Sequence, residues 1–205
     1  MKRIAFSLLI AYLLGSASPS ALLSKVKHAN LRENGSKNLG ATNTLLVLGK
    51  KWGALVMLLD IAKSYFAVKI AQLLVPASAA VAMASGFCAV VGHCFPFYLK
   101  GKGGKGLAAF GGIVLAFSPA LFAFLLSTAI VLIIVVNYSF IMPFYAAVSF
   151  PIYVACRIDG VLPLLFALAA SVLIFCKHFS NFQKARRGED IKIREYIRTK
   201  LLHKG

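Results

Sequence analysis

Long apolar runs separated by short polar segments dominate the chain. Residues 4–23, 52–75 and 77–99 form three such runs, and residues 107–176 are almost wholly apolar. A transmembrane helix needs about 20 consecutive, mainly apolar residues, so each of the first three runs is long enough to cross a membrane. The pattern predicts an all-α, polytopic integral membrane protein.

The long apolar segment 107–176 is interrupted by helix-breaking residues. These are Pro119, Asn137, Pro143, Pro151 and the turn at residues 157–160. The breaks near 118, 137 and 158 favour four short crossings over two long ones. Residues 107–117 are too few to span a bilayer at about 1.5 Å per residue, so a half-span or re-entrant segment also fits them. We therefore predict about seven transmembrane helices in a single domain, residues 1–205.

Basic residues gather in three polar segments and orient these helices. Lysine and arginine number six in residues 24–51, three in residues 100–106 and nine in residues 177–205. By the positive-inside rule all three segments are cytoplasmic. The N-terminus is then outside, the C-terminus is cytoplasmic, and the motif-bearing cytoplasmic segments are residues 30–51, 92–106 and 177–190.

Charge and cysteine content narrow the possible partners. A formal net charge of +17 would suggest nucleic acid in a soluble protein. Here the cations lie between apolar runs, so anionic substrates or lipid headgroups are expected and nucleic acid is not. The four cysteines form no CxxC pair and lie in or beside apolar runs, so we interpret them as small core side chains and predict no metal site.

The first cytoplasmic segment has the composition of a phosphate-binding loop. Glycines let backbone N–H groups turn toward an anion, neutral amides and hydroxyls add donors, and cations add charge-assisted ones. An ordinary solvated turn with helix caps has a similar composition, and this segment alone does not decide between them. The candidate ligands are Arg32, Gly35, Ser36, Lys37, Asn38, Gly40, Thr42 and Asn43.

The second cytoplasmic segment, residues 92–106, places lysines and glycines at the foot of an apolar run, as an anion cradle would. Its GxGxxG spacing lacks a βαβ context, and Gly106 stands where a P-loop needs Ser or Thr. His93 precedes this loop, and a structural or a functional role fits it equally. The cradle candidates are Lys102, Gly103, Gly104, Lys105 and Gly106.

Two further polar pairs have helical spacing. His178 and Asn181 are three residues apart where the last apolar run reaches the cytoplasmic surface, so a continuing helix would put them on one face. Asp60 and Lys63 are also three apart, inside an apolar run. Charges within a membrane are costly and usually paired, so we interpret this second pair as structural first and functional second.

These segments, in this order, resemble the bacterial acyl-phosphate:glycerol-3-phosphate acyltransferases. The likeness rests on Gly-Ser-x-Asn-x-Gly-Ala-Thr-Asn at 35–43, Gly-His-x-Phe-Pro at 92–96, Lys-Gly-Gly-Lys-Gly at 102–106, and His178-x-x-Asn181. The resemblance implies a seven-span enzyme of the bacterial inner membrane. It would transfer a fatty acyl group from acyl phosphate to glycerol 3-phosphate, giving lysophosphatidic acid and phosphate in phospholipid synthesis, with no metal or organic cofactor.

The resemblance also implies roles for individual residues. Ser36, His93, His178 and Asn181 would be catalytic, and the glycine- and lysine-rich loops would bind phosphate. Membrane lipid and an enzyme that produces acyl phosphate are the expected partners. The chain departs from the family pattern at three positions. Asn30 stands where aspartate is usual, and Leu46 and Lys184 stand where arginine is usual. Lysine cannot reproduce the bidentate contact of arginine, so substrate affinity could differ.

Acyl phosphate is an activated donor, so we expect direct attack by the acceptor hydroxyl without a covalent acyl-enzyme. His178, His93 or the substrate phosphate could take the proton, with the first and last favoured. The alternative function is a small transporter of phosphate esters. It is disfavoured because such proteins often carry internal repeats, and none is visible here. A non-catalytic scaffold that binds anionic lipid would not need these loops.

Overall fold

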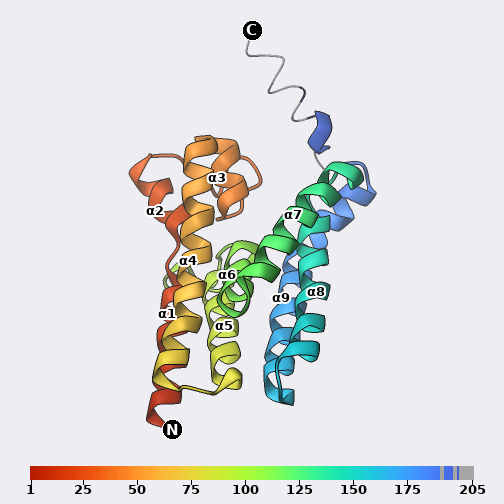
Figure 1. Ribbon diagram of the computed structural model, residues 1–205. Helices are drawn as coiled ribbons and strands as arrows, with labels where there is room; N and C mark the ends of the chain where they lie inside the picture. Colours follow the sequence, from red (N-terminus) through yellow and green to blue (C-terminus); the bar gives the residue numbers. More distant parts are fainter. Residues whose placement is uncertain (190–191, 196–197, 199–205) are drawn as a thin grey trace.

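The computed structural model describes residues 1–189, 192–195 and 198. All secondary structure in this part of the chain is helical, which confirms the all-α prediction. Figure 1 shows α1, α4 and α5 on one side, α8 and α9 on the other, and α6 between them. Residue 190, the end of the third predicted motif segment, lies outside the described residues, as do residues 191, 196–197 and 199–205.

The first apolar run forms two helices instead of one. α1 spans Lys2–Ser16, and α2 spans Pro19–Val26 with its proline at the first position, where a missing N–H costs nothing. Ser18 caps α2 by accepting a hydrogen bond from the Ala21 N–H at 3.3 Å. The sequence predicted one continuous span here. The Ser18 cap and Pro19 instead start a second helix directly after α1.

α1 packs closely on α5, which spans Ala79–Cys94. Glycines make this approach possible: a Cβ at Gly15 would lie 2.6 Å from Ala89 Cα, and a Cβ at Gly92 would lie 2.8 Å from Ser16 N. Both distances are shorter than a real Cβ tolerates. Small residues at a helix interface are typical of membrane proteins, where backbone proximity replaces the hydrophobic driving force.

The polar segment after α2 is partly helical. α3 spans Ala41–Leu48 and packs on α4, Lys50–Leu74, which follows after Gly49. The sequence predicted residues 24–51 as a polar loop containing glycine and asparagine. α4 has 25 residues, a length of about 37 Å at the usual helical rise.

The remaining helices follow the predicted breaks. α6 spans Leu107–Phe117, α7 Pro119–Val136, α8 Ile141–Arg157 and α9 Val161–Arg186. A short 3-10 helix, η1, spans Phe97–Leu99.

Two prolines predicted as breaks lie inside α8 instead. Pro143 is in the first turn of α8, where a backbone N–H would have no partner within the helix, so the N–H that proline lacks is not missed. Pro151 lies in the interior of the same helix, as neighbouring helices allow in membrane proteins.

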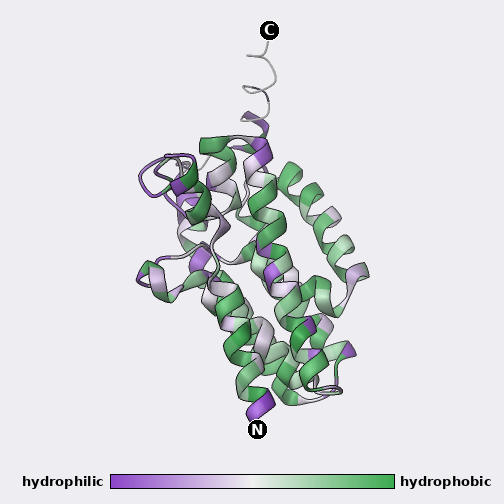
Figure 2. Ribbon diagram, turned by 90° about the vertical axis from the view of Figure 1, so that its left-hand side faces the viewer, coloured by the Kyte–Doolittle hydropathy of each residue, from purple (hydrophilic) through white to green (hydrophobic). Residues whose placement is uncertain are grey.

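Four helical segments of the described chain are long and apolar enough to cross a membrane: Lys2–Val26, Ala79–Leu99, Pro119–Val136 and Val161–Arg186. α6 and α8 are apolar but shorter. Figure 2 shows hydrophobic residues along most of the helices and hydrophilic residues mainly in loops and toward the C-terminal end. A multi-pass membrane protein is thus supported, while the count of seven and the orientation of the termini stay predictions.

The core lies where α5, α6, α8 and α9 meet. Phe110 of α6 and Phe150 of α8 are fully buried there, with ring centroids 5.4 Å apart at an interplanar angle of 83°. Large side chains such as Leu58, Val131 and Val172 are exposed on the outer faces, as contact with lipid requires.

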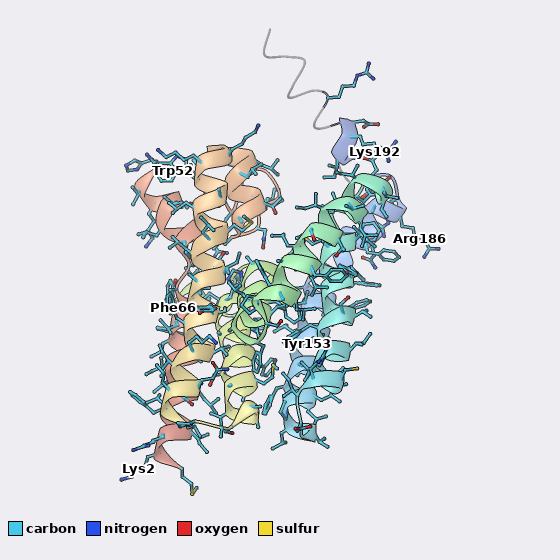
Figure 3. All side chains as sticks on the ribbon, viewed as in Figure 1. Lys2, Trp52, Phe66, Tyr153, Arg186 and Lys192 are labelled. Carbon is cyan, nitrogen blue, oxygen red and sulfur yellow. The ribbon has the colours of Figure 1, made fainter. Side chains whose placement is uncertain are left out.

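Charged side chains and Trp52 lie toward the two ends of the bundle. Lys2 lies at one end, whereas Trp52, Arg186 and Lys192 lie toward the other (Figure 3). Trp52 also stacks under a cation, with Lys27 Nζ 4.5 Å from its ring centroid. Tryptophan and basic residues are typical of a membrane–water interface, so the end that carries Trp52, Arg186 and Lys192 resembles such an interface.

Candidate active site

A fully buried asparagine shapes the first motif loop. Asn43, in the first turn of α3, accepts a hydrogen bond from the Ser36 N–H at 2.6 Å and donates one to the Leu31 carbonyl at 2.7 Å. Gly35 has a φ of +62° beside it, and a Cβ there would collide with Asn43 Oδ1. Both ends of the Asn43 amide are therefore engaged by the loop backbone, and this side chain positions residues 31–36.

The other candidates of this loop lie around Asn43. Ser36, Lys37 and Thr42 are exposed, and Asn38 is half-buried. Gly40 is the N-cap of α3, with no side-chain cap bond. The first amides of α3 therefore lack side-chain partners, a state that suits an anion.

The second motif loop folds back on the end of α5. The Gly103 N–H donates to the Cys94 carbonyl and the Gly104 N–H to the His93 carbonyl, each at 3.1 Å. In this structure the two amides pair with carbonyls at the end of α5, and phosphate binding by Gly103 and Gly104 stays a prediction. Both glycines also allow close packing: a Cβ at 103 would collide with the His93 carbonyl, and one at 104 with the His93 ring.

Gly106 plays a different part in this loop. It adopts a φ of +87° as the N-cap of α6, a conformation that glycine reaches without strain. The loop's lysine side chains, on Lys102 and Lys105, remain the groups suited to an anion.

Two hydrogen bonds bring the three motif segments together. Arg32 Nη2 donates to the Lys102 carbonyl at 2.7 Å, joining the first loop to the second. Lys105 Nζ donates to Asn181 Oδ1, joining the second loop to α9. The sequence predicted one shared membrane face, and these contacts place residues about 70 positions apart in one site.

His178 and Asn181 lie one turn apart on α9, as their spacing predicted. His178 is only 8% exposed, and neither ring nitrogen has a hydrogen-bond partner within the described structure. A buried polar group without a partner is uncommon and calls for an explanation. An imidazole open at both nitrogens beside a cationic loop is suited to exchange a proton with a bound substrate.

His93 belongs to a different cluster, one that sequence reasoning did not assemble. Its Nδ1 lies 2.9 Å from Lys63 Nζ and 3.3 Å from Asp60 Oδ1, while Asp60 and Lys63 pair at 2.8 Å. The spacing of Asp60 and Lys63 predicted their mutual pair correctly. No sequence signal linked them to His93, which lies on another helix.

No group of three His, Cys, Asp or Glu residues that could hold a metal ion occurs in the described part of the chain. All four cysteines are free; Cys94 is buried as expected, but Cys156 and Cys176 are exposed. The description of all four as core side chains was therefore wrong. Around Lys105 the side chains offered are cations and amides, which suit anions better than metals.

Known proteins share this architecture. The family model described as glycerol-3-phosphate acyltransferase matches residues 5–188. A glycerol-3-phosphate acyltransferase of Coxiella burnetii (strain RSA 493 / Nine Mile phase I) is 39% identical over 191 residues, covering 92% of this chain and 97% of the relative. One from Geobacillus kaustophilus is 35% identical over 192 residues, covering 93% and 96%.

Two solved structures have the same fold. Both are crystal structures of PlsY, described as an integral membrane glycerol 3-phosphate acyltransferase. The glycerol 3-phosphate form matches with a TM-score of 0.87 and 31% identity, and the lysophosphatidic acid form with 0.84 and 30%. Each match covers 92% of this chain and 94% of the other.

The match runs through all three motif segments and nearly the whole length of the relatives. It confirms the resemblance drawn from the motifs and favours an enzyme over the transporter and scaffold alternatives. The chain belongs to the glycerol-3-phosphate acyltransferase family and is a multi-pass membrane acyltransferase.

Proposed function

We propose that this protein transfers a fatty acyl group from acyl phosphate to glycerol 3-phosphate, yielding lysophosphatidic acid and inorganic phosphate. The observation that carries the proposal is the pair of hydrogen bonds from Arg32 to Lys102 and from Lys105 to Asn181. They gather cationic and amide groups from three segments at the ends of apolar helices. A reaction between two phosphate-bearing substrates, one with a fatty chain, needs such a junction.

The forms of the matched structures support the choice of acceptor and product. One is named for glycerol 3-phosphate and the other for lysophosphatidic acid. The acyl-phosphate donor follows from the motif resemblance and from the second cationic loop, which would hold a second anion. The apolar chain of donor and product would remain in the bilayer or against exposed apolar helix faces.

The proposed chemistry is a direct transfer. The acceptor hydroxyl attacks the acyl carbonyl, a C–O ester bond forms, the bond from the carbonyl carbon to the phosphate oxygen breaks, and phosphate departs with the electron pair. The Lys105 ammonium would stabilise charge on the phosphate or the carbonyl oxygen. The hydroxyl proton would pass to His178 or to the substrate phosphate.

The contacts of three side chains favour this scheme. His178 has two ring nitrogens without partners within the described residues, whereas His93 Nδ1 is engaged by Lys63. Ser36 is exposed, and among the described residues its hydroxyl has no histidine partner to activate it as a nucleophile. An acyl-enzyme on Ser36 therefore lacks the base that it would need.

We place the enzyme in the bacterial cytoplasmic membrane with seven crossings, its N-terminus outside and its motif loops in the cytoplasm. An enzyme that makes acyl phosphate would supply the donor. The whole chain would act as one domain, because the motif segments close a single site.

The test uses purified protein in lipid with glycerol 3-phosphate and either palmitoyl phosphate or palmitoyl-CoA, with product identified by mass spectrometry. Lysophosphatidic acid from palmitoyl phosphate alone is expected. Product from palmitoyl-CoA would overturn the donor assignment. Intact-mass analysis after palmitoyl phosphate without acceptor should show unmodified protein, and a palmitoylated Ser36 would overturn direct transfer.

A further inference from the structure

A buried cluster of charged and polar groups inside the helical bundle contains more members than the ion pair of Asp60 and Lys63. Asp60 and Lys63 neutralise each other at 2.8 Å, one turn apart on α4. Lys63 Nζ also donates to the Ala17 carbonyl at 2.7 Å, in the break between α1 and α2. His93 of α5 then approaches the same pair. Two helices, α4 and α5, and the break between α1 and α2 thus converge on one group of polar atoms.

The His93 ring is oriented by this cluster. Lys63 Nζ lies 2.9 Å and Asp60 Oδ1 lies 3.3 Å from the same ring nitrogen, Nδ1, so both charged groups of the pair contact one edge of the ring. Both His93 and Lys63 are at most 9% exposed, so water does not compete effectively for these contacts. A histidine whose Nδ1 is fixed by a charged partner has a fixed ring plane, as in the carboxylate-supported histidines of metal and catalytic sites.

The opposite edge of the ring supports the second motif loop. A Cβ at Gly104 would collide with His93 Nε2, and it would also lie 2.5 Å from the Leu39 carbonyl of the first loop. The Gly104 backbone is therefore held between the two. The His93 carbonyl accepts the Gly104 N–H at 3.1 Å, so both the backbone and the ring of His93 fix this point of the loop.

The next residue along the loop is Lys105, which contacts Asn181. The path from the buried cluster to the site is therefore short: Asp60 and Lys63 orient His93, His93 fixes Gly104, and Gly104 sets the start of the Lys105 side chain. Displacements of about 1 Å at a positioned catalytic group are large enough to reduce rates substantially.

From this geometry we propose that Asp60, Lys63 and His93 form a positioning network that sets the place of Lys105 for binding substrate phosphate. The proposal rests on the proposed function and assigns these three residues to it as positioning residues. A purely structural ion pair would only keep α4 neutral, and removing both charges together would then be harmless.

The main test is the double variant Asp60→Asn with Lys63→Met, which removes both charges and leaves no unpaired ion. Its matched control is Lys69→Met, a second partly buried lysine of α4 that donates to a backbone carbonyl, that of Ala116, at 2.9 Å. Thermal unfolding in detergent reports folding of each protein. The double variant is expected to unfold close to the wild-type temperature while KM for glycerol 3-phosphate or acyl phosphate rises about tenfold, the scale of one lost charged hydrogen bond.

Two variants of His93 distinguish the effect of its polar contact with Lys63 from the effect of its side-chain volume. In His93→Asn the side-chain amide can still meet Lys63 at the place of Nδ1, whereas His93→Leu fills the space without a polar atom. Partial recovery of KM in His93→Asn relative to His93→Leu is expected. Wild-type KM and kcat in the folded double variant, or losses that simply follow the unfolding temperature across the set, would overturn the proposal.

A binding measurement distinguishes failure of this inference from failure of the proposed function. Inorganic phosphate should raise the unfolding temperature of the wild type and of Lys69→Met, and raise that of the double variant less. If the wild type binds phosphate but transfers no acyl group, the proposed function fails and this comparison still decides the network. Equal phosphate stabilisation in all three proteins, or none in the wild type, would reject the network.

Discussion

Lys105 Nζ donates a hydrogen bond to Asn181 Oδ1, and this contact ties the glycine- and lysine-rich loop to α9 across 76 positions of sequence. Arg32 makes the corresponding link from the first loop to the second. The proposed substrate site therefore lies where three segments meet. Substitutions of two residues that contact each other there should have non-additive effects on activity. The following predictions use this property.

Lys105→Met and Asn181→Leu should each reduce kcat/KM by about a hundredfold or more, because each removes a group proposed to contact the reacting phosphates. Their double variant should lose less than the product of the two single losses, since each single variant already breaks the shared contact. Arg186→Met, which changes an exposed arginine on the last turn of α9, is the control and should stay within about twofold. Strict additivity would contradict a joint role.

His178→Gln should lower kcat by about a hundredfold to a thousandfold with little change in unfolding temperature, as expected for a general base with no hydrogen-bond partner to lose among the described residues. Steady-state kinetics with palmitoyl phosphate and glycerol 3-phosphate supply the measurement. A loss below about tenfold in a folded variant would instead favour the substrate phosphate as proton acceptor.

Gly104→Ala should impair activity more than Gly101→Ala, although both lie in the same loop. A methyl group at 104 meets the His93 ring and the Leu39 carbonyl, and such overpacking costs about 1–3 kcal/mol. At 101 nothing lies within 4 Å, so only the strain of a φ of +71° remains, about 1–2 kcal/mol. We expect KM for a phosphate substrate to rise in Gly104→Ala alone, and equal effects on KM would refute the packing argument.

Asn43→Ala should destabilise the first motif loop. It leaves the Ser36 N–H and the Leu31 carbonyl without their partner, at about 1–3 kcal/mol for each buried group that stays unpaired. Limited proteolysis between residues 31 and 40 and thermal unfolding would detect the change. Asn34→Ala removes an exposed side chain that bonds the Asn30 carbonyl, so it should cost little. Similar protease sensitivity in both variants would argue against the special role of Asn43.

The predicted orientation can be tested by cysteine labelling in a variant lacking the four native cysteines. Lys2→Cys should react with a membrane-impermeant maleimide added to intact cells, whereas Arg187→Cys should react only after permeabilisation. The reverse pattern would invert the topology and place the motif loops outside.

Much of the architecture was predictable because a helix within a membrane requires a continuous run of apolar residues, which is visible in the local sequence. Apolar runs and the breaks at Pro119, Asn137 and residues 157–160 gave the ends of four helices, since a helix must satisfy its own backbone within lipid. The split at Pro19 and the helical part of the first polar segment were missed. There, caps and packing against α4 decide the structure over stretches too short to have a clear hydrophobic pattern.

The sequence by itself determined the membrane class, the three motif segments and the family, because these depend on residue type and order. Tertiary structure alone showed that Asn43 holds its own loop, that the Gly103 and Gly104 amides complete the end of α5, and that His93 joins Asp60 and Lys63 from 30 positions away. The physical reason is that a polar group's function depends on which partners reach it. Those partners come from helices whose contacts are set by packing, not by proximity along the chain.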